Sequence, residues 1–466
     1  MACSGELPPE KRRRISATAP HAFHCLPCPL EINILQSLPS LVSLVRAAST
    51  CRRWRDLASD PGFRRRFRTN HPPPVLGLFF SPPNDAIPAI PSFAPVRRDD
   101  ADLAKVVLSG DFLLTPLYVG PRVAPPCWFV ADSRSGRLLL FNWQAMHLAL
   151  LNPLEKRVEG YFDFSELDLM DGGPQDQFLE PRLICFDEFP SRFWIFFLRH
   201  DQRRVQVGMF TDTMREGMLL PWLDAPERPN PNPNEQRDDW LEDGMVAGVF
   251  IYWFYKNYRH AIILDTTTEG LRCYAEEVPP AVYGEGAAYC VLGEDVAATE
   301  DPHACSPRIV YVHRNMIHRL TGGAPGSLAA PLLRDVVKDL GPDIESLFVD
   351  LHMQLPEVGN RFTIFGLRDG FVYFTTSHPV VQNVATWFCS LSLETGQVEK
   401  LLCRTYDARF QPYTMPWPRF LLGDPDDDND SGIGGPSDSS KGNNERRQDG
   451  PAFSKKNGRS STWSNL

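Results

Sequence analysis

Hydrophobic side chains recur with helical spacing in three short segments near the start of the chain. The first segment places four of them on one face of a helix: Leu30, Ile34, Leu35 and Leu38. Pro29 suits the first turn of a helix, and Pro39 cannot continue one. The pattern therefore predicts a helix that begins near Pro29 and ends before Pro39.

Two further segments follow at once. Apolar side chains of the second recur at i, i+3, i+4 and i+7: Leu41, Leu44, Val45 and Ala48. Ser40 can cap this helix. The third segment continues the period with Cys51, Trp54, Leu57 and Ala58. Pro61 and Gly62 end it, so three helices are expected between Cys28 and Asp60.

A unit of this size buries too little apolar surface to be comfortably stable alone. Side chains beyond those that it can bury internally therefore predict a surface that a partner covers. The alternative is that the three segments are core helices of a larger domain, which is what amphipathic helices usually are. Four arginines follow the third helix, where we expect a solvated face at the start of a linker: Arg64, Arg65, Arg66 and Arg68.

Fixed offsets between specific residue types favour the docking interpretation. They comprise two Leu-Pro pairs (Leu26–Pro27 and Leu38–Pro39), Leu41, Leu44, Arg46, Cys51, Trp54 and the run from Ser59 to Phe63. At these residues the chain resembles the F-box family, and the continuation FRRRFRTNHPPPVLGLFF resembles plant, especially grass, members. The resemblance implies docking to a Skp-type adaptor through these residues: Leu26, Pro27, Leu30, Ile34, Leu35, Leu38, Pro39, Leu41, Leu44, Val45, Cys51 and Trp54.

The pattern changes after Pro72, where short aromatic and β-branched runs alternate with Gly, Asp, Asn and Pro clusters. These runs predict strands. They begin at Val75, Cys127, Arg137, Phe193, Val205, Val249, Ala261, Arg308, Met316, Phe362, Phe371 and Trp387. Hairpin turns are predicted just before Arg137, Phe371 and Gln397, where the sequences SRSG, LRDG and LETG each end in Gly. LAAPLLRDVVKDLG, residues 328–341, is the main candidate helix of this region.

The chain is therefore expected to be an α+β multidomain protein. Its segments are a disordered basic N-terminus (1–23), a three-helix F-box domain (24–70), a mostly β domain (71–422) and a disordered acidic and polar tail (423–466). A β domain of about 350 residues exceeds most single sandwiches and barrels, so radial repetition is the economical architecture. We expect a β-propeller of six to eight blades, with packed β-sandwiches as the alternative.

Composition limits the partners. The net charge of −10 disfavours general nucleic-acid binding, which needs a basic surface. Eleven cysteines, an odd number scattered along 466 residues, indicate reduced thiols. No secretory signal is evident, no apolar run approaches the roughly 18 to 20 residues of a membrane span, and Lys11–Arg14 is a short basic cluster. We therefore expect a protein of the nucleus and/or cytoplasm that binds neither membrane nor nucleic acid.

Candidate catalytic and metal-binding residues are few. His21, His24, Cys25 and Cys28 lack the two-pair spacing of a zinc site, and no hydrolase or phosphate-binding motif is present. Cys51 falls on an apolar stripe, where packing explains it better than reactivity. Aspartates near strand ends, including Asp132, Asp187 and Asp265, fit turn or cap roles, with a polar propeller floor as the alternative. The expectation is no catalytic residue, no cofactor and no metal.

The resemblance and the two sequence textures together predict a function. The chain would be the non-catalytic substrate-recognition subunit of a Skp-cullin-F-box (SCF) ubiquitin ligase, binding the adaptor, and through it a cullin, at its start. Its β domain would hold an unknown protein substrate, with the polar stretch Pro226–Asp239 as one candidate contact loop. The alternatives are a propeller enzyme or ligand-binding protein whose helical start is structural, and an F-box scaffold that does not direct degradation.

Overall fold

The computed structural model describes residues 26–82, 89–96, 100–119, 127–164, 167, 177–186, 191–201, 203–214, 216–224, 241–256, 259–267, 271–280, 290–294, 307–313, 316–321, 327–328, 333–343, 346, 362–376, 386–404 and 410–422. The chain divides into two compact units, Met1–His71 and Pro72–Leu466. The predicted disordered segments 1–23 and 423–466, the stretch Pro226–Asp239 and the residues His21, His24 and Cys25 lie outside the described residues.

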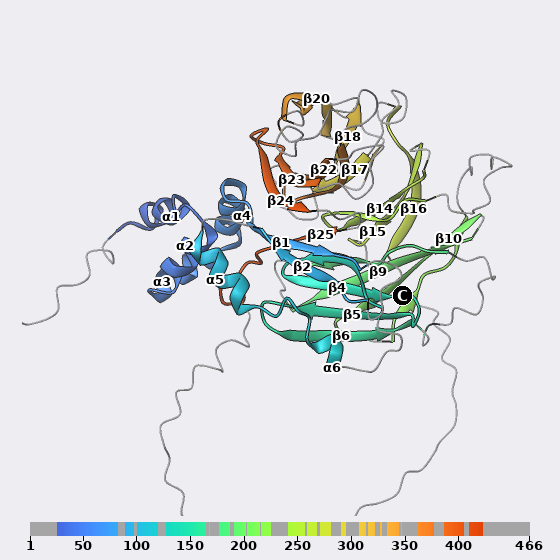
Figure 1. Cartoon of the computed structure of the whole chain (residues 1–466), viewed down its shortest axis with the longest axis horizontal. Coiled ribbons are helices and arrows are strands. Elements are labelled where there is room, and N and C mark those ends of the chain that lie inside the picture. Colours follow the sequence, from blue (N-terminus) through green and yellow to red (C-terminus); the bar gives the residue numbers. More distant parts are fainter. Residues whose placement is uncertain are drawn as a thin grey trace, which may run out of the picture. The chain divides into compact units, whose positions relative to one another are not determined.

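The first unit is helical (Figure 1). The three predicted helices are α1 (Cys28–Gln36), α2 (Leu41–Ala48) and α3 (Arg52–Ser59). The backbone N–H of Ser43 donates to the Ser40 hydroxyl at 3.2 Å, which confirms Ser40 as the cap of α2. The three-helix prediction is therefore confirmed in position and order, but it is incomplete.

A fourth helix, α4 (Pro61–Asn70), follows α3 directly. The prediction that a linker begins after Pro61 is wrong. Pro61 ends α3, yet its fixed φ and missing N–H also suit the first turn of the next helix. The Asp60 carboxylate caps α4 by accepting from the Phe63 N–H at 2.8 Å. Arg64, expected on a solvated face, is only 6% exposed.

In its described residues the second unit contains six β-sheets, and four of them are four-stranded meanders (Figure 1). The first five blades contain β3 (Phe129–Arg134), β4 (Arg137–Asn142), β5 (His147–Asn152) and β6 (Arg157–Asp163); β7 (Gln177–Phe178), β8 (Arg182–Cys185), β9 (Phe193–His200), β10 (Arg204–Thr211), β11 (Met218–Leu219) and β12 (Leu223–Asp224); β13 (Met245–Ala247), β14 (Phe250–Phe254), β15 (His260–Asp265) and β16 (Arg272–Glu277); β17 (Cys290–Glu294), β18 (Pro307–His313), β19 (Met316–Thr321) and β20 (Leu333–Asp339); and β21 (Phe362–Arg368), β22 (Phe371–Thr376), β23 (Thr386–Ser392) and β24 (Val398–Arg404).

The sixth blade joins the two ends of this unit. It consists of β1 (Val75–Phe80), β2 (Ser92–Pro95) and β25 (Phe410–Thr414), in the order β2-β1-β25. The last strand pairs antiparallel with the first, with Phe80 opposite Phe410 and Val75 opposite Thr414. The unit is therefore a six-bladed β-propeller, as the sequence predicted, and not a pair of packed sandwiches.

The apolar core of the propeller lies between neighbouring blades. Ile251 and Trp253 of β14 pack toward the second blade, whereas Tyr252 and Phe254 of the same strand pack toward the fourth. Successive side chains of a strand point to opposite faces, so a strand covered by blades on both sides is apolar throughout. This burial explains the uninterrupted apolar run that begins at Val249.

One predicted helix and two observed ones differ from expectation. Residues 328–341 were expected to be helical, but Leu333–Asp339 form strand β20, which pairs with β19. Its adjacent Val336 and Val337 favour a strand, since β-branched residues fit a pleated surface better than a helix. The structure also contains α5 (Ala101–Ser109) and α6 (Pro116–Val119), which were not predicted, and a final 3-10 helix, η4 (Arg419–Leu421).

Two of the predicted turns have both central residues in the left-handed region. The φ angles are 47° and 76° at Ser135 and Gly136, between β3 and β4, and 52° and 78° at Asp369 and Gly370, between β21 and β22. Positive φ at both positions is typical of the tight hairpin turn that matches strand twist. The two glycines differ in their surroundings. A Cβ on Gly136 would lie 2.7 Å from Pro416, whereas one on Gly370 would meet nothing within 4 Å.

We expect Gly136→Ala to destabilise the propeller more than Gly370→Ala. Each substitution forces alanine into the left-handed region, at about 1 to 2 kcal/mol, and Gly136→Ala adds an overpacking penalty of about 1 to 3 kcal/mol against Pro416. Thermal unfolding of the two variants measures the difference. Equal losses of stability would show that Pro416 moves aside at little cost.

Candidate functional site

The helical unit has a small core of its own. Its members are nearly inaccessible to solvent: Leu35, Leu41, Leu44, Ala48, Ala58, Phe63 and Phe67. Phe63 and Phe67 lie one turn apart on α4 and stack with ring centroids 5.9 Å apart. Each of the four helices contributes at least one of these residues, so the core holds all four helices together.

A buried carboxylate connects α1 to α3. Glu31 is 1% exposed and forms an ion pair with Arg53, whose Nε lies 2.7 Å from Oε2. Arg53 also donates from Nη2 to the Leu26 carbonyl at 3.2 Å. A buried charge is tolerated when it is paired in this way. The pair fixes the chain segment before α1 against α3.

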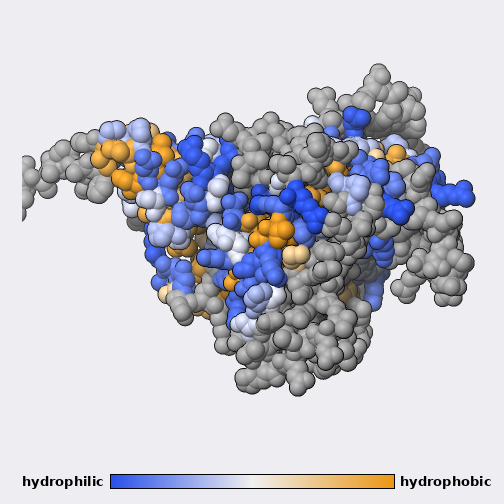
Figure 2. All heavy atoms as spheres, turned by 90° about the horizontal axis from the view of Figure 1, so that it is seen from above, coloured by the Kyte–Doolittle hydropathy of each residue, from blue (hydrophilic) through white to orange (hydrophobic). Residues whose placement is uncertain are grey.

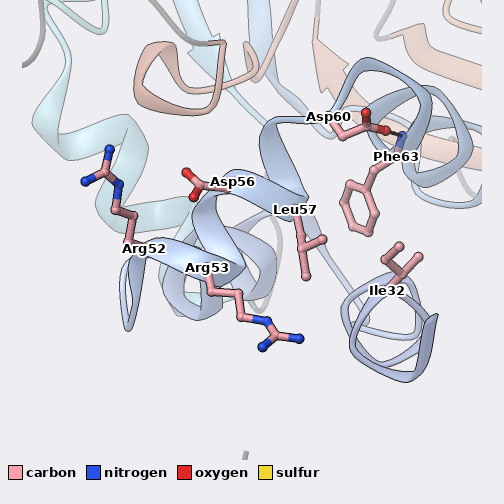
Figure 3. A pocket seen from close by; sticks show the side chains of 7 residues that line it. All are labelled: Ile32, Arg52, Arg53, Asp56, Leu57, Asp60 and Phe63. Carbon is pink, nitrogen blue, oxygen red and sulfur yellow. Dashed lines mark hydrogen bonds between the residues drawn. The ribbon is translucent and has the colours of Figure 1, made fainter. Parts of the chain in front are cut away.

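A groove of about 720 Å³ opens between α1, α3 and the start of α4 (Figure 3). Ile32, Leu57 and Phe63 approach one another from the three helices and form its apolar part. Arg52, Arg53, Asp56 and Asp60 supply its charged part, and Asp60 is held by its bond to the Phe63 N–H. An apolar recess with a charged rim suits a side chain of a protein partner.

Apolar residues also remain on the outside of α1. Leu30 is 49% exposed and Ile34, one turn later, is 36% exposed. Figure 2 shows apolar surface on the helical unit next to hydrophilic side chains. Residues 26–71 contain eight arginines and three acidic residues, which gives this segment a net charge of +5. The helical unit is therefore basic, and it exposes apolar side chains on α1.

The propeller has its main polar cluster at Asp132, on β3. The carboxylate is 2% exposed, and it accepts from Nη2 of Arg368 on β21 at 2.8 Å and from the Leu183 N–H of β8 at 3.0 Å. The Nε of Arg134 lies 3.4 Å from Oδ2, the oxygen that also accepts from the Leu183 N–H. Burial by itself raises the pKa of Asp132, but Arg134, Arg368 and Arg182 outweigh it and lower that pKa to about 2.

The arginines around Asp132 also bind main-chain carbonyls of other blades. Arg182 of β8 donates to the carbonyls of Ala131 in the first blade and Gly244 before β13. Arg134 donates to the Val246 carbonyl of β13 at 3.3 Å, and Arg368 donates to the Ser133 carbonyl. Four blades, the first, second, third and fifth, are therefore linked through one buried charge cluster.

Asp132 does more than serve a local turn. It does bind locally, accepting from the Ser133 N–H at 2.7 Å, but its contacts with Leu183 and Arg368 make it a link between blades. Asp265, by contrast, accepts from the Thr267 N–H and hydroxyl and serves a local turn. Asp187 lies outside the described residues. Most donors of the arginines are used within the protein, so the cluster has a structural role.

A second ionic cluster lies on the outer strand of the first blade. Glu159 accepts from Arg137 at 2.5 Å, from Arg157 at 2.9 Å and from Arg419 of η4 at 3.1 Å. Burial raises the pKa of Glu159, but Arg137 and Arg157 reverse this and lower it. The bond from Arg419 connects the segment after the last strand to the first blade.

Among the described residues, no group of three or more His, Cys, Asp and Glu side chains could hold a metal ion. No described helix combines the length and the apolar character that crossing a bilayer requires.

Residues 23–70 match a family model described as F-box-like. The helical unit is an F-box-like domain. The match ends before β1, so it covers no part of the propeller. The likeness to plant and grass members stays a prediction, and no curated protein matches the sequence.

Solved structures with a similar arrangement include a protein of unknown function from Bacteroides caccae, at 8% identity and TM-score 0.36, covering 73% of this chain and 99% of that one. A protein from Lactobacillus plantarum has 11% identity and TM-score 0.28, covering 61% and 70%. Regucalcin, a calcium-binding protein from Agrobacterium tumefaciens, has 10% identity and TM-score 0.26, covering 62% and 91%.

The F-box-like domain divides the predicted docking residues into three groups. Leu35, Leu41 and Leu44 belong to its core and have almost no surface to offer a partner. Half-buried residues are Leu26, Leu38, Val45, Cys51 and Trp54, and exposed ones are Pro27, Leu30, Ile34 and Pro39. The predicted list omitted Ile32, Leu57 and Phe63 of the groove. The one-turn spacing of Phe63 and Phe67 was a signal for α4, and hence for the third wall of the groove.

We expect the free energy of unfolding of the Asp132→Asn variant to fall less than that of the wild type as the pH is lowered. The folded-state pKa of about 2 lies below the ordinary 3.8, so the ionised carboxylate stabilises the fold fully above the ordinary value. That stabilisation is lost as pH falls through the folded value, and its size is about 2 kcal/mol. Unfolding of both proteins by urea, measured between about pH 6 and pH 2, tests this.

Asp265→Asn is the matched control, because its carboxylate serves a turn outside the cluster. It should follow the wild-type profile. Parallel profiles for wild type and Asp132→Asn would contradict the assignment of Asp132 as a charge that links the blades. If Asp132→Asn does not fold, Arg368→Gln, which removes one partner, gives the same comparison.

Proposed function

We propose that this protein is the substrate-recognition subunit of an SCF-type ubiquitin ligase. The observation that carries the proposal is the combination of an F-box-like domain with a separate six-bladed propeller in one chain. F-box domains generally bind Skp-type adaptors, and the adaptor would connect the chain to a cullin. The propeller would hold a target protein.

In this role the chain makes and breaks no bond. It places a lysine of the bound target near the activated ubiquitin, and holding two reactants together raises the effective concentration of one for the other. A propeller suits this task because its loops are carried by a rigid framework and can vary independently. The cluster around Asp132 adds to that rigidity by joining four blades.

The adaptor would bind the exposed part of the predicted surface. Leu30 and Ile34 are the large apolar side chains of α1 that solvent reaches most, and the groove of Ile32, Leu57 and Phe63 lies on the same domain. Burying one such side chain contributes about 1.5 to 3 kcal/mol. Leu30 and Ile34, with the half-buried Ile32 and Leu57 of the groove, would supply apolar area that offsets the association cost, whereas Phe63 is already buried in the core.

Co-expression of the full chain with a Skp-type adaptor tests the proposal. We expect the wild type to retain the adaptor in a pull-down, and Leu30→Asp with Ile34→Asp to lose at least about tenfold in affinity. Thr69→Asp, at an exposed position on α4, is the matched control and should bind normally. Leu44→Asp is unsuitable, because Leu44 is fully buried and the variant would lose its fold.

Adaptor binding by both the wild type and the double variant would place the docking surface elsewhere. A folded wild-type chain that retains no adaptor would contradict the proposed function. Ubiquitin-dependent turnover of a bound partner separates a degradative subunit from a scaffold, because a scaffold would bind its partner without shortening its lifetime.

A further inference from the structure

A pocket of about 270 Å³ opens between the first and second blades of the propeller. The first blade contributes residues of β6, and the second contributes the start of β9 and the turn after β10. The lining residues are Arg157, Val158, Glu159, Phe162, Ser191, Phe193 and Asp212. A recess of this volume suits one long side chain of a partner. We call it the interblade pocket.

Aromatic rings form the apolar wall of the interblade pocket. Phe162 and Phe193 are 3% and 5% exposed, and their rings lie edge to face with centroids 6.1 Å apart. Both belong to the apolar core between the two blades, so the wall is fixed by packing on its far side. The aliphatic stem of a lysine or an arginine can lie along such a wall while its charged end reaches a polar group.

The turn that carries Asp212 is held in place by main-chain hydrogen bonds. The Asp212 N–H donates to the Phe193 carbonyl at 3.2 Å. One residue earlier, the Thr211 N–H donates to the Met214 carbonyl at 3.2 Å, and the Thr211 hydroxyl accepts from the Met214 N–H at 2.9 Å. A ligand that binds this turn therefore meets a backbone that is already ordered, which lowers the cost of binding.

The unsatisfied charge of the interblade pocket is negative. Asp212 is half-buried, and within the described part of the chain its carboxylate has no hydrogen-bond or ion-pair partner. The two other charged lining residues are paired with each other, because Arg157 donates to Glu159 at 2.9 Å. Residues 72–422 contain 45 acidic and 30 basic residues, a net charge of −15, so the field of the propeller also favours a cation.

We propose that the interblade pocket binds a lysine or arginine side chain of the target protein. The inference rests on the proposed function, since it takes the propeller to be the part that holds a target. The aliphatic stem packs against Phe162 and Phe193, and the ammonium or guanidinium group donates to the Asp212 carboxylate. Ser191, whose hydroxyl also has no partner among the described residues, can accept a second hydrogen bond from that group.

Saturation-transfer NMR on the full-length chain tests the proposal with single-residue probes. These are Nα-acetyl-arginine amide, Nα-acetyl-lysine amide and the uncharged Nα-acetyl-norleucine amide, which has a similar stem. We expect the two cationic amides to bind at least about tenfold more tightly than the uncharged one, and added salt to weaken them. Asp212→Asn should lower their affinity about tenfold, because it removes the charged acceptor but keeps its shape.

Asp224→Asn is the matched control. Asp224 is an exposed carboxylate of β12 in the same blade and does not line the pocket, so this variant should bind like the wild type. If Asp212→Asn does not fold, Ser191→Leu at an exposed position fills the pocket instead and should weaken binding by a similar factor.

Three outcomes would overturn the proposal. Equal binding of all three amides would show that the charge of Asp212 is not used, as would unchanged binding by Asp212→Asn. Stronger binding of Nα-acetyl-glutamate amide would assign the pocket to an anion held by Arg157. A wild-type dimer that Asp212→Asn dissolves would assign the pocket to self-association.

The adaptor pull-down distinguishes this inference from the proposed function. If the chain retains the adaptor and Asp212→Asn leaves turnover of the target unchanged, the role of the interblade pocket is rejected and the proposed function is kept. If the cationic amides bind in a way that depends on Asp212 but the wild-type chain retains no adaptor, the pocket keeps its preference for a cation and the proposed function is rejected.

Discussion

The pairing of β25 with β1 brings together strands that lie more than three hundred residues apart and makes them neighbours in one blade. A ring of blades buries its apolar faces only when each blade has a neighbour on both sides, because the core lies between the blades. Without the sixth blade, the faces of the first and fifth would be exposed. Burial of the whole apolar core therefore depends on closure of the ring.

Ion pairs and hydrogen bonds between blades also stabilise the closed ring. Arg368 of the fifth blade reaches Asp132 and Ser133 of the first, past the sixth blade that lies between them in the ring. The Tyr413 hydroxyl of β25 donates to the Gly136 carbonyl at 2.7 Å, and Arg419 binds Glu159 on the outer strand of the first blade. Polar contacts therefore bind β25 and the segment that follows it to the first blade.

The two units divide the surface chemistry as well as the fold. The F-box-like domain carries a positive charge and exposed apolar side chains on α1, whereas the propeller carries a large negative charge. An acidic partner is therefore favoured at the F-box-like domain and a basic one at the propeller, which suits the proposed role of connecting an adaptor to a target.

Local spacing was enough to predict α1, α2, α3, twelve of the 25 strands in the described part of the chain and the tight turns at Gly136 and Gly370, because these depend on near neighbours in the chain. The F-box-like identity also came from fixed offsets within forty or so residues. Tertiary structure alone decided the number of blades, the burial of Leu35, Leu41 and Leu44, and the cluster that joins Asp132 to Arg182 and Arg368. Those features depend on contacts between residues far apart in the chain. Local hydrophobic spacing does not specify which distant strand pairs with a given strand, or which arginine pairs with a given carboxylate.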